Sequence, residues 1–149
     1  MENIETLLKD IKNNFYRFRN GIIANSMRVL YPKGKMIFGL NVPQFIELSS
    51  LYPKSRDLAK ALWDDNSSRE TRLLALYLFP PSSITFPDII ELMESLESTE
   101  QADFLAFKVL RNIPDPKEVY NELIKIKFTN PLSNYAINMF QKNIEARYN

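Results

Sequence analysis

The sequence contains neither cysteine nor histidine. This excludes disulfides, thiolate zinc sites, cysteine nucleophiles and histidine-based acid–base catalysis. Any chemistry must therefore come from carboxylates, lysine, tyrosine, serine or threonine. Glycine occurs only three times, which disfavours hairpin-rich β folds and phosphate-cradling loops.

Long apolar runs are also missing. No segment approaches the roughly 18 apolar residues that a membrane span needs. The beginning of the chain contains acids and no apolar core, which argues against a signal peptide there. We therefore expect a cytoplasmic protein with no membrane partner, and nothing in the sequence indicates a cofactor.

What the sequence does contain is apolar residues at helical spacing along nearly its whole length. The nine prolines fall mostly between these apolar stretches, where they mark helix starts and stops. Residues 68–79 illustrate the pattern, because Ser68 precedes an apolar helix that Pro80 and Pro81 terminate. The sequence predicts one all-α domain over residues 1–149.

Three segments of equal length align without gaps and share a small residue at one position of their second helix. The segments are residues 58–79, 89–110 and 119–140, with Ala75, Ala106 and Ala136 at the shared position. A small residue there lets neighbouring helices approach closely, as in stacked helical hairpins. The alternative is a non-repetitive helical bundle in which three alanines align by chance.

The formal net charge is +1, but the charges are unevenly distributed. Residues 1–35 are rich in cations, whereas residues 88–103 contain six acids and no cation. The best candidates for phosphate contacts are Arg17, Arg19, Arg28, Lys33 and Lys35. The alternative is an ordinary solvated face on two helices. Three aromatic residues are interleaved with these cations, namely Phe15, Tyr16 and Tyr31. Their spacing also fits burial in the core.

Two motifs follow one another along the chain. The first is residues 38–45 (FGLNVPQF), and the second is residues 58–63 (LAKALW) together with residues 70–75 (ETRLLA). They resemble the entry motif and the next signature of the DNA alkylation repair family. The similarity spans roughly residues 5–145. It implies an all-α superhelix of stacked HEAT-like helical hairpins, with a concave groove that holds DNA. In active members of that family, the groove supports excision of alkylated bases.

The resemblance places Asp103 where the family has a catalytic carboxylate, which would stabilise an oxocarbenium-like sugar. Thr99 stands where the family has a tryptophan, and residues 131–136 lack the arginines that bind the lesion phosphate. Asp103 is therefore either a catalytic carboxylate or an ordinary helix side chain. Glu100 is a second candidate acid.

Arg72, Asp103 and Ser133 occupy equivalent positions in the three aligned segments, so we expect them to line one face. Arg72 either contacts a phosphate or pairs with Glu70 or Asp103. Trp63 is either a stacking residue for a base or a packing residue at the end of an apolar stripe.

The leading interpretation is a non-catalytic alkylation-repair-like domain that binds nucleic acid or another protein. If it binds double-stranded DNA, the contacts should be mainly to phosphate and strongly salt-dependent. One alternative is an active DNA N-glycosylase that excises N3- or N7-alkylated purines, with Asp103 as the electrostatic stabiliser. The other is a protein-interaction scaffold, in which a protein partner or self-association covers an apolar end of the array.

Overall fold

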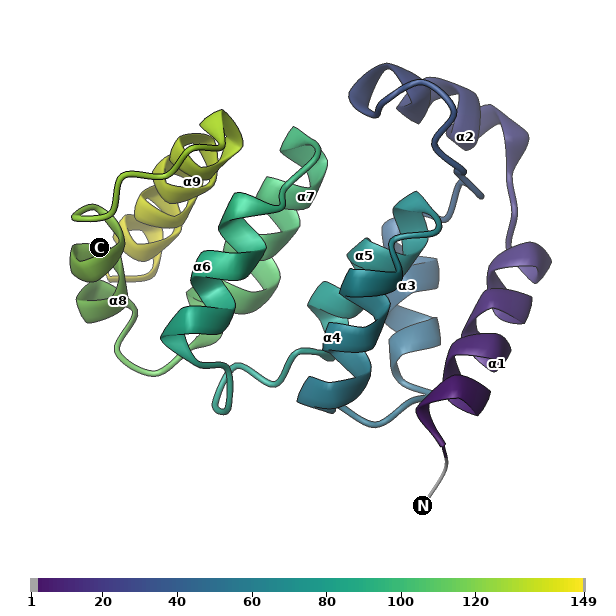
Figure 1. Ribbon diagram of the computed structural model, residues 1–149, viewed down its shortest axis with the longest axis horizontal. Helices are drawn as coiled ribbons and strands as arrows, with labels where there is room; N and C mark the ends of the chain where they lie inside the picture. Colours follow the sequence, from purple (N-terminus) through teal and green to yellow (C-terminus); the bar gives the residue numbers. More distant parts are fainter. Residues whose placement is uncertain (1–2, 149) are drawn as a thin grey trace. The chain divides into compact units, whose positions relative to one another are not determined.

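The computed structural model describes residues 3–148, and every regular element in that part of the chain is helical (Figure 1). This confirms the all-α prediction. The chain divides after Phe79 into two compact units, called here the N-unit and the C-unit. Among residues 3–148, none of the helices combines the length and the apolar character that crossing a lipid bilayer requires.

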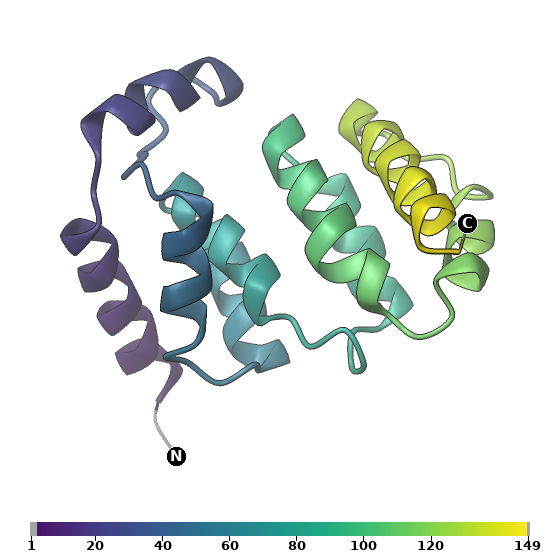
Figure 2. The ribbon, with the colours of Figure 1, turned by 180° about the vertical axis from the view of Figure 1, so that it is seen from behind.

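In its described part, residues 3–79, the N-unit has five α-helices and a short 3₁₀ turn. Its elements are α1 (Ile4–Arg17), α2 (Gly21–Met27), η1 (Arg28–Leu30), α3 (Val42–Ser49), α4 (Arg56–Asp65) and α5 (Arg69–Leu78). Helix α4 packs against both α1 and α5, and α3 packs against α5. Helix α2 runs crosswise to the other helices of this unit in both views (Figures 1 and 2).

Side-chain caps explain where the helices of the N-unit begin. The helix predicted after Ser68 does begin there, because the Ser68 hydroxyl accepts the backbone N–H of Thr71 at 3.2 Å. Helix α3 begins in the same way, with Asn41 accepting the backbone N–H of Gln44 at 3.0 Å. The starts of α3 and α5 are therefore set by local hydrogen bonds from capping residues in the sequence.

The C-unit is a helical array gathered around α9. Its elements are α6 (Phe86–Glu94), α7 (Thr99–Phe104), the π-helical segment η2 (Leu105–Val109), the 3₁₀ turn η3 (Leu110–Asn112), α8 (Pro116–Leu123) and α9 (Pro131–Tyr148). Helices α6, α7 and α8 each pack against α9 (Figure 2). In the predicted segment 89–110, the second helix therefore begins as the α-helix α7 and continues without a break as the π-helical segment η2 and the 3₁₀ turn η3.

The three aligned alanines are all fully buried. Ala75 lies in α5, Ala106 in the π-helical segment η2, and Ala136 in α9. Both α7 and η2 pack against α9, so the small side chains lie where helices meet. This agrees with the role that the predicted helical-hairpin repeats assign to the shared position.

The start of α9 is fixed by a carboxylate from α6. Glu94 accepts the backbone N–H groups of Thr129 and Asn130, each at 3.0 Å, and the Thr129 hydroxyl at 2.8 Å. The hydrogen bond from the Asn130 backbone holds the pKa of the Glu94 carboxyl below its usual range. Nearby, the buried Ser133 hydroxyl donates to the Met93 carbonyl at 2.8 Å. Ser133 is therefore a packing residue and does not line an open face.

Candidate nucleic-acid interface

The cations of the N-unit are concentrated in one part of the chain. No aspartate or glutamate occurs between Asp10 and Glu47, whereas six lysines and arginines do. Over its full sequence the N-unit has twelve cations against eight acids, a net charge of +4, and the C-unit has seven against ten, a net charge of −3. The basic character of the sequence is therefore carried by residues 11–46.

A buried carboxylate holds the chain that follows these cations. The side chain of Glu70, on the first turn of α5, is 0% exposed. Its two oxygens accept the backbone N–H groups of Phe38 at 2.9 Å, Gly39 at 3.0 Å and Leu40 at 3.4 Å. The Arg69 guanidinium lies 2.6 Å from the same carboxylate, which neutralises its charge. The two motifs that carry the family resemblance are thus bonded to each other.

The same segment is pressed closely against α2. The backbone N–H of Asn20, the cap of α2, donates to the Phe38 carbonyl at 2.7 Å. Gly39 has a φ of +96°, and a Cβ at this position would lie 2.2 Å from the Asn20 carbonyl oxygen. Only glycine fits both the conformation and the close approach. The loop is therefore fixed to α5 on one side and to α2 on the other.

Two hollows open on this part of the N-unit. The first has a volume of about 440 Å³ and is lined by Arg28, Val29, Tyr31, Pro32, Lys33, Gly34, Lys35 and Ile37. The second has a volume of about 390 Å³ and is lined by Tyr16, Arg19, Gly21, Ala24, Asn25, Arg28, Met36, Ile37 and Phe38. Arg28 and Ile37 line both hollows, so the two are neighbours. We refer to Arg19, Arg28 and Lys33 as the basic surface.

The three cations of the basic surface are exposed. The Arg28 side chain is oriented by its neighbour, because its Nε donates to the Asn25 side-chain oxygen at 3.3 Å. Arg17 is also exposed, at the end of α1, where its guanidinium lies 3.4 Å from the side-chain oxygen of Asn14. Four of the five predicted N-terminal cations line the two hollows, and Arg17 is the exception.

Lys35 lines the first hollow, but its ammonium group is engaged in hydrogen bonds within the protein. Its ammonium donates to the Asn66 carbonyl at 3.1 Å and to the Asn66 side-chain oxygen at 2.5 Å. Asn66 is the left-handed cap of α4, with a φ of 46°, so Lys35 satisfies a carbonyl at the end of that helix. A phosphate would have to compete with these bonds.

Arg72 lies elsewhere in the N-unit and is buried. Its guanidinium carbon is 4.3 Å from the centre of the Trp63 ring, and its Nε donates to the Trp63 carbonyl at 3.1 Å. The carboxylate of Glu70 is bonded to Arg69 instead. Trp63 is buried as well, in agreement with its interpretation as a packing residue.

The three aromatic residues interleaved with the cations have different surroundings. Phe15 and Tyr31 are buried in the core, whereas Tyr16 is 52% exposed. The Tyr16 ring meets the Phe38 ring edge to face, with centroids 4.7 Å apart and planes at 74°. Tyr16 is therefore an exposed aromatic ring in a hollow that also contains Arg19 and Arg28.

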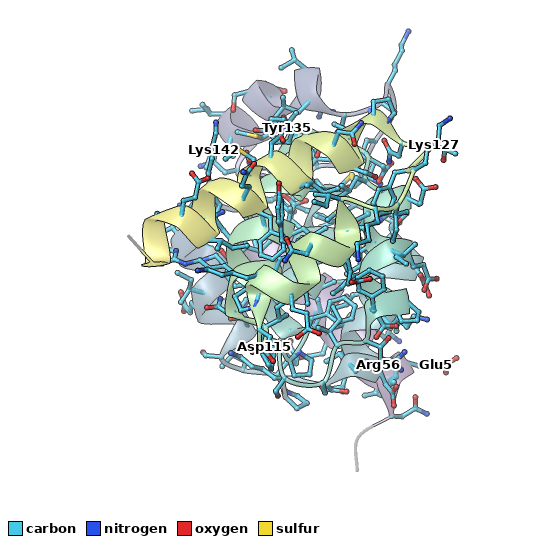
Figure 3. All side chains as sticks on the ribbon, turned by 90° about the vertical axis from the view of Figure 1, so that its left-hand side faces the viewer. Glu5, Arg56, Asp115, Lys127, Tyr135 and Lys142 are labelled. Carbon is cyan, nitrogen blue, oxygen red and sulfur yellow. The ribbon has the colours of Figure 1, made fainter. Side chains whose placement is uncertain are left out.

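Asp103, the candidate catalytic carboxylate, is half-buried on α7 in the C-unit. It accepts a hydrogen bond of 2.9 Å from the hydroxyl of Tyr135 on α9, which is labelled in Figure 3. This bond to Asp103, aided by partial burial and by the carboxylate charge, raises the pKa of Tyr135 above its usual value. Sequence reasoning missed Tyr135, although it stands one residue before the aligned Ala136.

Within the described residues, no group of three or more acidic side chains could hold a metal ion. Comparisons of the chain with protein-family models, curated proteins and solved structures find no match. The resemblance to the DNA alkylation repair family remains a prediction from the two motifs.

Proposed function

We propose that the N-unit is a non-catalytic nucleic-acid-binding domain that contacts the phosphate backbone through Arg19, Arg28 and Lys33. One observation supports this most directly. A stretch with six cations and no acid folds so that three exposed cations lie around two adjacent hollows. Phosphate contacts of this kind fix a backbone in place and release its condensed counterions.

The charges in these hollows can act together on a ligand. Arg28 lies between the two hollows, with Arg19 beside one and Lys33 beside the other. Each neutralised phosphate adds roughly 0.7 to 0.9 to the slope of log affinity against log salt concentration. Three contacts predict modest affinity that falls steeply between low and physiological salt.

The proposal assigns no catalytic role to Asp103. The Asp103 carboxylate already accepts the Tyr135 hydroxyl, and it belongs to the unit with a surplus of acids. A field of that sign repels a phosphate backbone. We therefore expect binding without release of 7-methylguanine or 3-methyladenine from alkylated DNA.

Fluorescence anisotropy with labelled oligonucleotides over a salt series tests the proposal. The double variant Arg19→Gln, Lys33→Gln should weaken binding and flatten the salt slope by roughly 1.4 to 1.8. The matched control is Lys127→Gln, Lys142→Gln, which removes the same charge from exposed positions of the C-unit (Figure 3). The control should retain affinity and slope.

Two results would refute the proposal. One is the absence of binding to any oligonucleotide at low salt. The other is an equal loss of affinity in the two double variants, which would indicate a general effect of net charge.

Vesicles with anionic lipid serve as a second ligand, because Ile22 and Val29 on α2 and η1 are exposed apolar residues. Binding to vesicles but not to oligonucleotides would assign the cations to a lipid surface instead.

A further inference from the structure

We propose that the ligand of the basic surface is single-stranded nucleic acid and that one of its unpaired bases stacks on Tyr16. This inference rests on the proposed function and specifies its ligand. It replaces the double-stranded DNA that the family resemblance implies. The inference is carried by one observation: the exposed aromatic ring of Tyr16 lines the same hollow as two cations, Arg19 and Arg28.

The helix places Tyr16 outside the core for a clear reason. Phe15 continues the apolar stripe of α1 and is completely buried, whereas the next residue points about 100° away around the helix. A single exposed aromatic residue is common on protein surfaces and needs no explanation by itself. Tyr16 differs because it lines a defined hollow together with two cations, Arg19 and Arg28.

The Tyr16 ring is also held in position. Its edge-to-face partner Phe38 packs against the buried Phe15, with centroids 5.7 Å apart. The backbone N–H of Phe38 is bonded to the buried Glu70 carboxylate. A chain of contacts thus connects the exposed ring to the loop that the buried Glu70 carboxylate holds. A ring fixed in advance loses little conformational freedom when a base stacks on it.

The dimensions of the site suit a short stretch of backbone with its bases turned inward. The volumes of about 440 and 390 Å³ both lie within the range of small-molecule pockets, roughly 300 to 1,000 Å³. Arg28, which lines both hollows, can contact a phosphate between two successive nucleotides. Arg19 then lies beside the base that stacks on Tyr16, and Lys33 beside the neighbouring nucleotide.

The stacking contact selects against a duplex. In double-stranded DNA the faces of each base are covered by its neighbours, so a protein ring can stack only on a base that has left the helix. Single-stranded binders combine a basic groove with aromatic platforms for this reason, and every base provides a face for stacking. The site should therefore prefer single strands while showing little preference for sequence.

The test compares three labelled probes of equal length at low salt, namely oligothymidylate, an oligonucleotide of abasic sites and a duplex. Wild-type protein should bind oligothymidylate more tightly than either of the others. Tyr16→Leu should bind oligothymidylate roughly 5- to 150-fold more weakly, the range expected for loss of one stacked base. Tyr16→Phe keeps the ring and should bind like the wild type.

The salt dependence separates this inference from the proposed function. Tyr16→Leu should keep the wild-type salt slope, because it removes no phosphate contact, whereas Arg19→Gln, Lys33→Gln should flatten it. Equal binding of the abasic and thymidylate probes, or tighter binding of the duplex, would refute base stacking and leave phosphate binding in place. Failure of all three probes to bind would refute both proposals. Unfolding followed by Trp63 fluorescence verifies that each variant is folded.

Discussion

Substituting Glu70 by glutamine should strongly destabilise the N-unit. The glutamine side chain has the same shape, but it is neutral and has only one acceptor oxygen. Three backbone N–H groups and the Arg69 guanidinium now share the two oxygens of a side chain that is fully buried. Glu70→Gln therefore removes the carboxylate charge beside the buried Arg69 guanidinium and leaves fewer acceptor oxygens for the same donors.

The magnitude follows from the burial of the pair. Breaking a buried ion pair by removing one partner costs about 3 to 5 kcal/mol, because the remaining charge is uncompensated. Small domains have a total stability of about 5 to 15 kcal/mol, so this loss is a large fraction of the total. Replacing both partners, in Arg69→Met, Glu70→Gln, should cost less than the sum of the two single substitutions.

The assay is urea unfolding followed by fluorescence. Trp63 is the single tryptophan in the sequence and is buried in the N-unit, so its emission reports the unfolding of that unit. The matched control is Glu47→Gln on the exposed side of α3, which should change the free energy of unfolding by less than about 0.5 kcal/mol. If Glu70→Gln is no more destabilising than this control, the buried carboxylate does not hold the loop in the way described above.

Three further predictions concern other contacts. Gly39→Ala should destabilise the N-unit by more than about 3 kcal/mol, because the new Cβ would overlap the Asn20 backbone and the backbone would be strained. Gly34 also has a positive φ, +89°, but a Cβ there would have no atom within 4 Å, so Gly34→Ala should cost only about 1 to 2 kcal/mol. Urea unfolding measures both. Asp103→Ala should lower the raised pKa of Tyr135 towards 10.0, as seen in the tyrosinate absorbance with Tyr135→Phe as the reference. In the wild type, the stability linked to that pKa is present below pH 10.0 and is lost as the pH rises through the folded value. Glu94→Gln should destabilise the protein at neutral pH and flatten its loss of stability in acid. The reason is that the lowered pKa of Glu94 contributes stability that is present above pH 4.5 and is lost as the pH falls through the folded value. Denaturation followed by far-ultraviolet circular dichroism at neutral and at acidic pH measures this.

The helical character of the chain could be predicted because it depends on local patterns. The apolar spacing, the prolines and the Ser68 cap act over a few residues, and each leaves its signature in the sequence. The exposure of Tyr16 also follows from helical geometry once Phe15 is assigned to the core. The concentration of cations in residues 11–46 is read directly from the sequence.

The contacts that shape the candidate site could not be predicted in this way. Glu70 stands among charged residues at a helix start and looks like a solvated acid, but it is buried by a loop about thirty residues earlier in the chain. Lys35 looks like a phosphate-binding lysine, but Asn66 engages it across a similar separation. Long-range pairs of this kind depend on the packing of helices, which local patterns do not specify.

The division of charge between the two units determines how the protein behaves on charged surfaces in general. A net charge of +1 is the sum of +4 on one unit and −3 on the other. Adsorption to a resin depends on the local field of the patch that faces it and only weakly on the total charge. Near neutral pH the protein should therefore be retained by both cation and anion exchangers, and its isoelectric point is a poor guide to its purification.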